Sequence, residues 1–244
     1  MFDPWLSGFT FGIAILAAYV ALALANRIAA TESRETRVPW FILGSLATGL
    51  GLWAMHFVGL MAFQILQVIS YDVNHLIGSA IAATFVAAVI LVLGSRRHLG
   101  PVLLAAGSIA VAAGLTATHL VAIGGLHAEL TVSYRAVPLA LGVGVAVLAG
   151  LLLLAAPERL RGGGSEISAL RVTISVGAGV GLAGAHFLFL LATTVARTGR
   201  SSQGDHMLLT SPALGAVLVV AAVLILSVAL LGALADRYLL ARSS

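Results

Sequence analysis

Seven apolar stretches, each long enough to cross a lipid bilayer, constrain this chain more than any other feature. A helix that spans the hydrocarbon core needs about 20 mostly apolar residues. The stretches run over residues 6–28, 40–66, 75–93, 101–124, 136–156, 172–195 and 212–235. They lack the two-residue alternation of lipid-facing strands. Because 60% of the 244 residues are hydrophobic and 9% are charged, a soluble domain is excluded. The sequence predicts one all-α domain over residues 1–244, a seven-transmembrane helix bundle.

The arginines between these stretches predict how the bundle is oriented. All 13 basic residues are arginine; ten lie in the first, third and fifth connections and the C-terminal tail, and three in the other connections. Because cytoplasmic loops carry the excess of positive charge, we expect the N-terminus outside and the C-terminus in the cytoplasm. Arginines scattered over short loops do not form a nucleic-acid-binding patch. The first stretch has no basic leader and is interpreted as a retained helix.

Three histidines, His56, His119 and His186, lie inside the second, fourth and sixth stretches. They are 63 and 67 residues apart, and this near-constant interval indicates internal two-helix repeats. All three helices are expected to run outward. At a rise of 1.5 Å per residue, the three imidazoles should therefore lie at a similar depth, in the outer half of the bilayer.

A glycine precedes each of these histidines by five residues, at Gly51, Gly114 and Gly181. Small residues let helix backbones approach closely in lipid. We therefore expect the three glycines to form a contact between the histidine helices, just below the imidazoles.

Three polar rings at one depth in hydrocarbon indicate a shared site, because each would cost free energy without a partner. Neutral imidazole is a ligand for copper, zinc, nickel and iron. We predict a metal site with His56, His119 and His186 as ligands. Met55 is a candidate fourth ligand, and its thioether would favour copper(I). The alternative for Met55 is core packing.

Other classes of function stay open at this point. Two of the histidines could be axial ligands of a haem, or all three could form interhelical hydrogen bonds or part of a metal path. His206 and Met207, in an outer loop, are either an entry site for metal or an ordinary solvated pair. Deep carboxylates are missing from the predicted helices, which counts against coupled transport. With no nucleophile or phosphate-binding loop beside the histidines, we expect no enzymatic activity.

The segment from Met55 to Leu60, MHFVGL, resembles the signature of the MHYT domain, a bacterial integral-membrane sensor domain. The resemblance covers nearly the whole chain, including the two-helix repeats and the predicted topology. The family pattern, Met-His-Tyr-x-Gly-Met, occurs three times; all three histidines match, but the leading methionine remains only as Met55 and the glycine only as Gly59. The copy is degenerate, and its three histidines would accept copper(II) or zinc as readily as copper(I).

The resemblance implies a function that the residues alone do not. Members of the family are proposed to bind copper, to sense oxygen, carbon monoxide or nitric oxide, and to carry cytoplasmic signalling modules. The chain is therefore expected to be a copper-binding gas sensor of the bacterial inner membrane, with zinc or haem as alternative cofactors. The chain ends shortly after the seventh stretch, so we expect its output in another part of a longer protein or in a separate cytoplasmic partner.

Overall fold

Six long helices form the body of the computed structural model, which describes residues 2–63, 70–127, 130–160, 169–197, 208–209 and 220–232. The helices are α1 (Pro4–Ala30), α2 (Arg34–Ala62), α3 (Val73–Gly94), α4 (Pro101–Gly124), α5 (Ala136–Leu160) and α6 (Ala169–Ala192). By length and composition each of the six can cross a membrane. The prediction of an all-α membrane bundle is confirmed, and the protein is a multi-pass membrane protein.

The helix boundaries follow local sequence signals. Asp3 begins α1, because its carboxylate accepts a hydrogen bond of 2.9 Å from the N–H of Leu6 and a proline follows it. Asp72 begins α3 in the same way, accepting from the N–H groups of Asn74 and His75. These caps explain why the observed starts lie two residues before the predicted ones at 6 and 75.

Two helices end earlier than predicted, whereas the second begins at Arg34 instead of residue 40 and the fifth extends to Leu160 instead of residue 156. The second helix was expected to reach residue 66 but stops at Ala62, where Phe63 is extended (φ −82°, ψ 95°) and its N–H bonds to the carbonyl of Leu60. The sixth was expected to reach residue 195, whereas Thr193 to Val195 belong to a strand. Two threonines and a valine are β-branched, and β-branched residues favour the extended chain where a partner strand is available.

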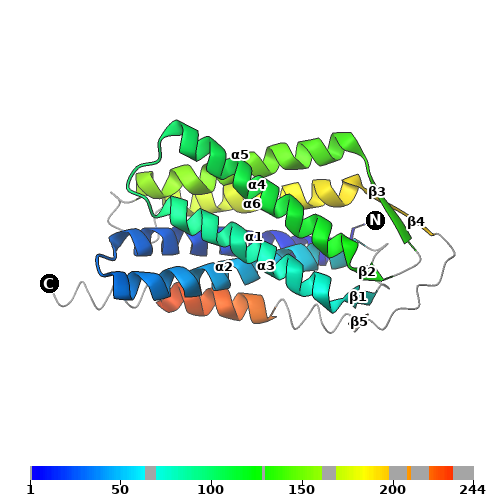
Figure 1. The fold of residues 1–244 in the computed structure, drawn as a ribbon, viewed down its shortest axis with the longest axis horizontal. Coiled ribbons are helices and arrows are strands. Elements are labelled where there is room, and N and C mark those ends of the chain that lie inside the picture. Colours follow the sequence, from blue (N-terminus) through cyan, green and yellow to red (C-terminus); the bar gives the residue numbers. More distant parts are fainter. Residues whose placement is uncertain are drawn as a thin grey trace.

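Short strands gather at one end of the bundle (Figure 1). β1 (Ser70–Asp72) pairs antiparallel with both β2 (Leu126–His127) and β5 (Leu208–Leu209). β3 (Leu130–Tyr134) pairs antiparallel with β4 (Thr193–Arg197), with Tyr134 opposite Thr193. The sequence did not predict these strands. They lie in the connections after the histidine helices, so they cover the end of the bundle toward which these helices run.

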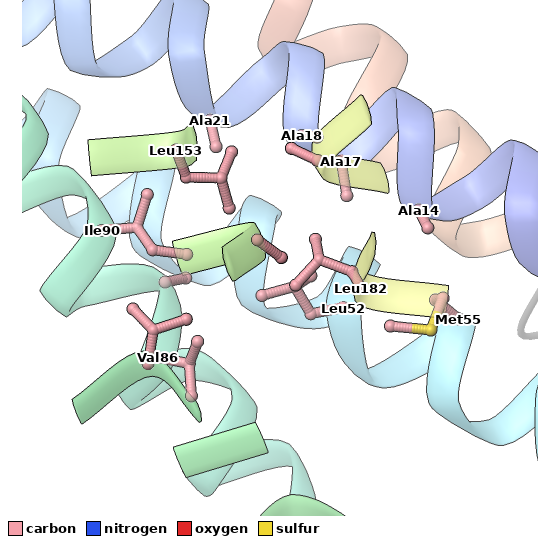
Figure 2. Packing of buried hydrophobic residues seen from close by; sticks show 14 of the residues in the cluster. Ala14, Ala17, Ala18, Ala21, Leu52, Met55, Val86, Ile90, Leu153 and Leu182 are labelled. Carbon is pink, nitrogen blue, oxygen red and sulfur yellow. The ribbon is translucent and has the colours of Figure 1, made fainter. Parts of the chain in front are cut away.

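The helices form a closed ring. Each packs against the next in sequence, α6 returns against α1, and the odd-numbered helices α1, α3 and α5 also contact one another. Alanines of α1 belong to the same buried cluster as side chains of α2, α3, α5 and α6 and point toward them (Figure 2). The ring therefore consists of three helix pairs, and each pair contributes one histidine.

A seventh helical segment lies beside the ring. Residues 220–232 of the predicted stretch 212–235 are helical, and the rest of that stretch lies outside the described residues. Leu226 is fully buried. Its side chain contacts α2, since a Cβ at Gly51 would lie 2.8 Å from it. The segment therefore packs on the bundle as a helix, next to the histidine-bearing α2.

Candidate metal centre

The structure brings His56, His119 and His186 together in the interior of the bundle. One ring nitrogen from each lies within 4.8 Å of the other two. The ring centroids of His56 and His186 are 4.3 Å apart, and that of His119 lies 5.5 and 5.7 Å from them. All three side chains are buried, with relative exposures of 4%, 0% and 3%. Three helices distant in sequence thus place three imidazoles in one small volume.

Most of the nitrogens in this cluster make no hydrogen bond with the part of the chain that the structure describes. Nε2 of His56, Nδ1 of His119 and both ring nitrogens of His186 are buried without a partner in the described part of the chain. Buried polar atoms normally have a partner, and leaving one unsatisfied costs about 1–3 kcal/mol. A structural layer of interhelical hydrogen bonds would use these atoms. A neutral imidazole has a lone pair on one of its two nitrogens, so each ring can offer one lone pair to a ligand.

The distances fit a single metal ion. Histidine nitrogens bind zinc at about 2.0–2.1 Å in a tetrahedral arrangement, so any two nitrogens on one ion lie about 3.4 Å apart. Nitrogens within 4.8 Å of one another reach this separation by side-chain movements of less than about 1 Å. Three neutral imidazoles in an apolar surrounding form a donor set suited to copper and zinc.

Aromatic rings and one glycine shape the walls of the site. The ring centroid of Phe189 lies 5.4 Å from that of His119, and the centroid of Tyr134, on β3, lies 6.5 Å from it. Burial raises the pKa of Tyr134, so its hydroxyl stays protonated at neutral pH. A Cβ at Gly59 would lie 2.4 Å from Nε2 and Cδ2 of His186. Only glycine therefore leaves room for that ring.

A small cavity adjoins the histidines. Its volume is about 10 Å³, which is about the space occupied by one water-sized probe. It is lined by His56 and His186 together with Leu52, Met55, Ala83, Leu115, Thr118, Leu182, Ala185 and Phe189. Met55 thus borders the same space as two of the histidines. Pockets for organic cofactors measure about 300–1,000 Å³, so this cavity does not have room for a haem.

The family follows from comparison with known proteins. The family model of the MHYT repeat, described as a bacterial signalling protein N-terminal repeat, matches residues 49–107, which include His56. The chain belongs to the MHYT family. The MHYT signature predicted from the sequence is therefore confirmed.

Curated relatives place this MHYT chain among bacterial signalling proteins. The bifunctional diguanylate cyclase/cyclic di-GMP phosphodiesterase MucR of Pseudomonas aeruginosa is 30% identical over 250 residues, covering 100% of this chain and 35% of that protein. Signaling protein YkoW of Bacillus subtilis is 26% identical over 80% of the chain and 24% of its own length. Cyclic di-GMP phosphodiesterase NbdA of P. aeruginosa is 31% identical over 66% of the chain and 20% of its own length. The chain spans about a third or less of these relatives, and no solved structure matches it.

The three repeated glycines do not form the contact expected of them in this MHYT bundle. Gly51 faces Leu226 of the C-terminal helical segment, Gly114 faces Val86 of α3, and Gly181 faces Ala149 of α5. Five residues along a helix correspond to a rotation of about 140°, so a glycine five positions before a histidine points away from the side that the histidine faces. The prediction of a shared glycine contact is wrong, and each glycine accommodates a different neighbour.

Three further residues outside the MHYT signature concern the site. His206 and Met207, predicted as a metal entry site, lie outside the described residues. Thr193, which sequence reasoning missed, contacts His119: its Oγ1 lies 3.1 Å from Nε2. Its position offered one signal, because Thr193 follows His186 by seven residues, which is about two helical turns and returns to the same face.

Proposed function

We propose that this MHYT domain is a membrane sensor that binds one metal ion through His56, His119 and His186. The observation that carries the proposal is the convergence of three buried imidazoles, most of whose nitrogens have no hydrogen-bond partner among the described residues. Such a cluster is costly in an apolar interior unless a ligand uses the lone pairs. The alternative of a hydrogen-bonded structural layer is disfavoured, since His186 makes no hydrogen bond within the described chain.

Copper is the metal we propose, with zinc as the alternative. Imidazole suits both ions, and a thioether adds a preference for copper(I). Met55 is buried and borders the cavity beside His56 and His186, so it is the candidate fourth ligand. Bound copper would supply a soft, redox-active centre in a site from which the surrounding apolar side chains exclude water.

The ligand that we propose to be sensed is a diatomic gas: oxygen, carbon monoxide or nitric oxide. A cavity of about 10 Å³ beside the histidines has room for about one water-sized molecule, so a diatomic gas, which is slightly larger, would have to displace the surrounding side chains to enter. Its walls come from four helices, α2, α3, α4 and α6. A guest in this space would move side chains of all four, and the packing of the histidine helices would change with occupancy.

The proposed topology has seven spans, with the N-terminus outside and the C-terminus in the cytoplasm of a bacterial inner membrane. Ten of 13 arginines belong to the connections assigned to the cytoplasmic side. The helical segment 220–232 packed beside α2 supports a seventh span. The histidine cluster and the short strands would then lie toward the outer face.

Signalling output is proposed to lie outside this chain. MucR and NbdA are named for cyclic di-GMP synthesis or hydrolysis. By analogy we propose that this domain controls a cytoplasmic signalling module, in a longer protein or in a separate partner, and that the 244 residues themselves catalyse no reaction.

Elemental analysis of the detergent-purified protein tests the proposal. The wild type is compared with His56→Ala, His119→Ala and His186→Ala, and with His98→Ala as the matched control. His98 is an exposed histidine paired with Glu158, outside the cluster. We expect near-stoichiometric copper or zinc in the wild type and His98→Ala, and its loss from each of the other three. Metal content that does not change in the three cluster variants would overturn the proposal. A haem absorption spectrum of the purified protein would show that the cofactor is haem in place of copper or zinc.

A further inference from the structure

One hydrogen bond determines which nitrogen of His119 keeps a free lone pair. Nε2 of His119 lies 3.1 Å from Oγ1 of Thr193, and the same Oγ1 lies 2.9 Å from the carbonyl oxygen of Phe189. His119, Thr193 and Phe189 are all buried. A neutral imidazole has one nitrogen that donates and one that accepts, and the partner of one nitrogen fixes the role of the other.

The hydrogens in this chain of contacts can be assigned by counting donors. The carbonyl of Phe189 can only accept, so the single hydroxyl proton of Thr193 is directed to it. Oγ1 of Thr193 is then an acceptor toward His119, and Nε2 of His119 must carry the ring proton. Nδ1 of His119 is buried with no hydrogen-bond partner in the described chain, as expected for an unprotonated nitrogen in an apolar site.

We propose that Thr193 is a positioning residue that holds His119 in the Nε2–H tautomer, so that Nδ1 is the nitrogen it offers as a ligand. The opposite assignment would direct the hydroxyl proton to Nε2 and place the ring proton on Nδ1. That proton would then be a buried donor without an acceptor, and the carbonyl of Phe189 would lose the hydroxyl bond. The Nε2–H tautomer satisfies both groups.

The segment from the end of α6 to the start of β4 positions the Thr193 hydroxyl beside His119. Thr193 is the first residue of β4 and pairs with Tyr134 of β3, so strand pairing fixes its position at the end of α6. His186, seven residues earlier, belongs to the same helix. The C-terminal end of α6 therefore supplies His186 to the cluster, and Thr193, which follows it, orients His119. The carbonyl of Phe189 accepts the hydrogen bond from the Thr193 hydroxyl.

The consequence for metal binding rests on the proposed function. Residues that orient a metal-binding histidine through its other nitrogen typically change metal affinity by about 10–100-fold when they are removed. Thr193→Val keeps the shape of the side chain and removes the hydroxyl, whereas Thr193→Ser keeps the hydroxyl. Thr116→Val is the matched control, because the Thr116 hydroxyl also bonds a carbonyl four residues earlier, on α4, with no histidine as partner.

The tautomer can be measured without metal, which separates this inference from the proposed function. Metal-free protein labelled with ¹⁵N-histidine is studied by long-range ¹H–¹⁵N correlation NMR, and His119 is assigned by its loss in His119→Gln. We expect protonated Nε2 and unprotonated Nδ1 in the wild type, in Thr193→Ser and in Thr116→Val, and loss of this signature in Thr193→Val. Copper titration should then show about 10–100-fold weaker binding for Thr193→Val alone.

Two results would overturn the inference. One is a ring proton on Nδ1 of His119 in the wild type; the other is an unchanged tautomer in Thr193→Val. If Thr193→Val does not fold, the wild-type and Thr193→Ser spectra still decide between the two assignments. A wild-type protein with the expected tautomer but no affinity for copper or zinc would contradict the proposed function and leave the tautomer assignment standing.

Discussion

The imidazole of His186 lies directly against Gly59, so that a Cβ atom at position 59 would fall 2.4 Å from both Nε2 and Cδ2 of the ring. Gly59 stands three residues beyond His56 on α2, about one helical turn. The glycine that remains from the MHYT signature therefore lies where a side chain would occupy the space of a histidine ring. Its role is to shape the cluster.

Changing Gly59 to alanine should disrupt the site more than the fold. The added methyl group must displace His186, because a contact of 2.4 Å is far below van der Waals separation. We expect metal affinity to fall by at least about 10-fold, as for other losses of ligand orientation. Chelator competition with copper and with zinc measures the affinity.

Gly184→Ala is the control for this change, because open space surrounds the Cβ position of Gly184, on the same helix as His186. Alanine is a better helix former than glycine by about 0.8–1.0 kcal/mol, so Gly184→Ala should keep the metal and unfold no more easily than the wild type. Wild-type affinity in Gly59→Ala would refute the shaping role of Gly59.

Replacing His186 by leucine should stabilise the metal-free protein. Both ring nitrogens of His186 are buried without partners in the described chain, and an unsatisfied buried polar group costs about 1–3 kcal/mol. Leucine removes that cost at a similar volume, so we expect a gain of about 1 kcal/mol in the free energy of unfolding. Thermal unfolding after chelation measures it.

At saturating metal the wild type should become more stable than His186→Leu, since a ligand stabilises only the state that binds it. The wild type should gain stability on addition of copper, and His186→Leu should not. A metal-free His186→Leu protein that is less stable than the wild type would mean that His186 contributes packing or hydrogen bonds of its own.

The sequence was sufficient to predict the helices and the residues of the cluster. Apolar length defined six helices, and the predicted bounds of α4, 101–124, agree with the observed ones. The interval between the histidines predicted equal depth, and equal depth on alternate helices of a closed ring brings the rings together. These properties depend on length and period, which a single sequence contains.

Contacts between residues distant in the chain could not be predicted from the sequence. The role of Thr193 depends on where α6 ends, and that end is set by the pairing of β4 with β3. The sequence has no periodic pattern that predicts this strand pairing. Gly59 matched the signature, but its contact with His186 depends on how α2 and α6 cross. Such contacts are set by tertiary packing, so the same residues in another bundle geometry would have other neighbours.

Trp53 links α2 to α3, and its loss should weaken the fold without affecting metal. Its indole N–H donates a hydrogen bond of 3.0 Å to Oγ of Ser79, which in turn donates to the carbonyl of Leu76. Interhelical hydrogen bonds of this kind contribute about 0.6 kcal/mol on average. A double-mutant cycle of Trp53→Phe and Ser79→Ala should give a coupling of that size by reversible unfolding in detergent. Loss of metal from Trp53→Phe would instead place the indole in the site.

Asp72 should make the stability of the protein depend on acidic pH. Its carboxylate accepts hydrogen bonds from Nδ1 of His75 at 3.2 Å and from the N–H groups of His75 and Asn74, and these bonds, with the His75 side chain first, lower the pKa of Asp72 below its ordinary 3.8. A lowered pKa means that the carboxylate contributes its full stabilisation above the unfolded value and loses it as the pH falls through the folded value. The melting temperature of Asp72→Ala should therefore lie below that of the wild type above about pH 4, and the difference should close at lower pH. Asp72→Asn, which keeps an acceptor for the first turn of α3, should lie between the two. A difference that does not close at low pH would show that Asp72 stabilises α3 in some way other than through its charge.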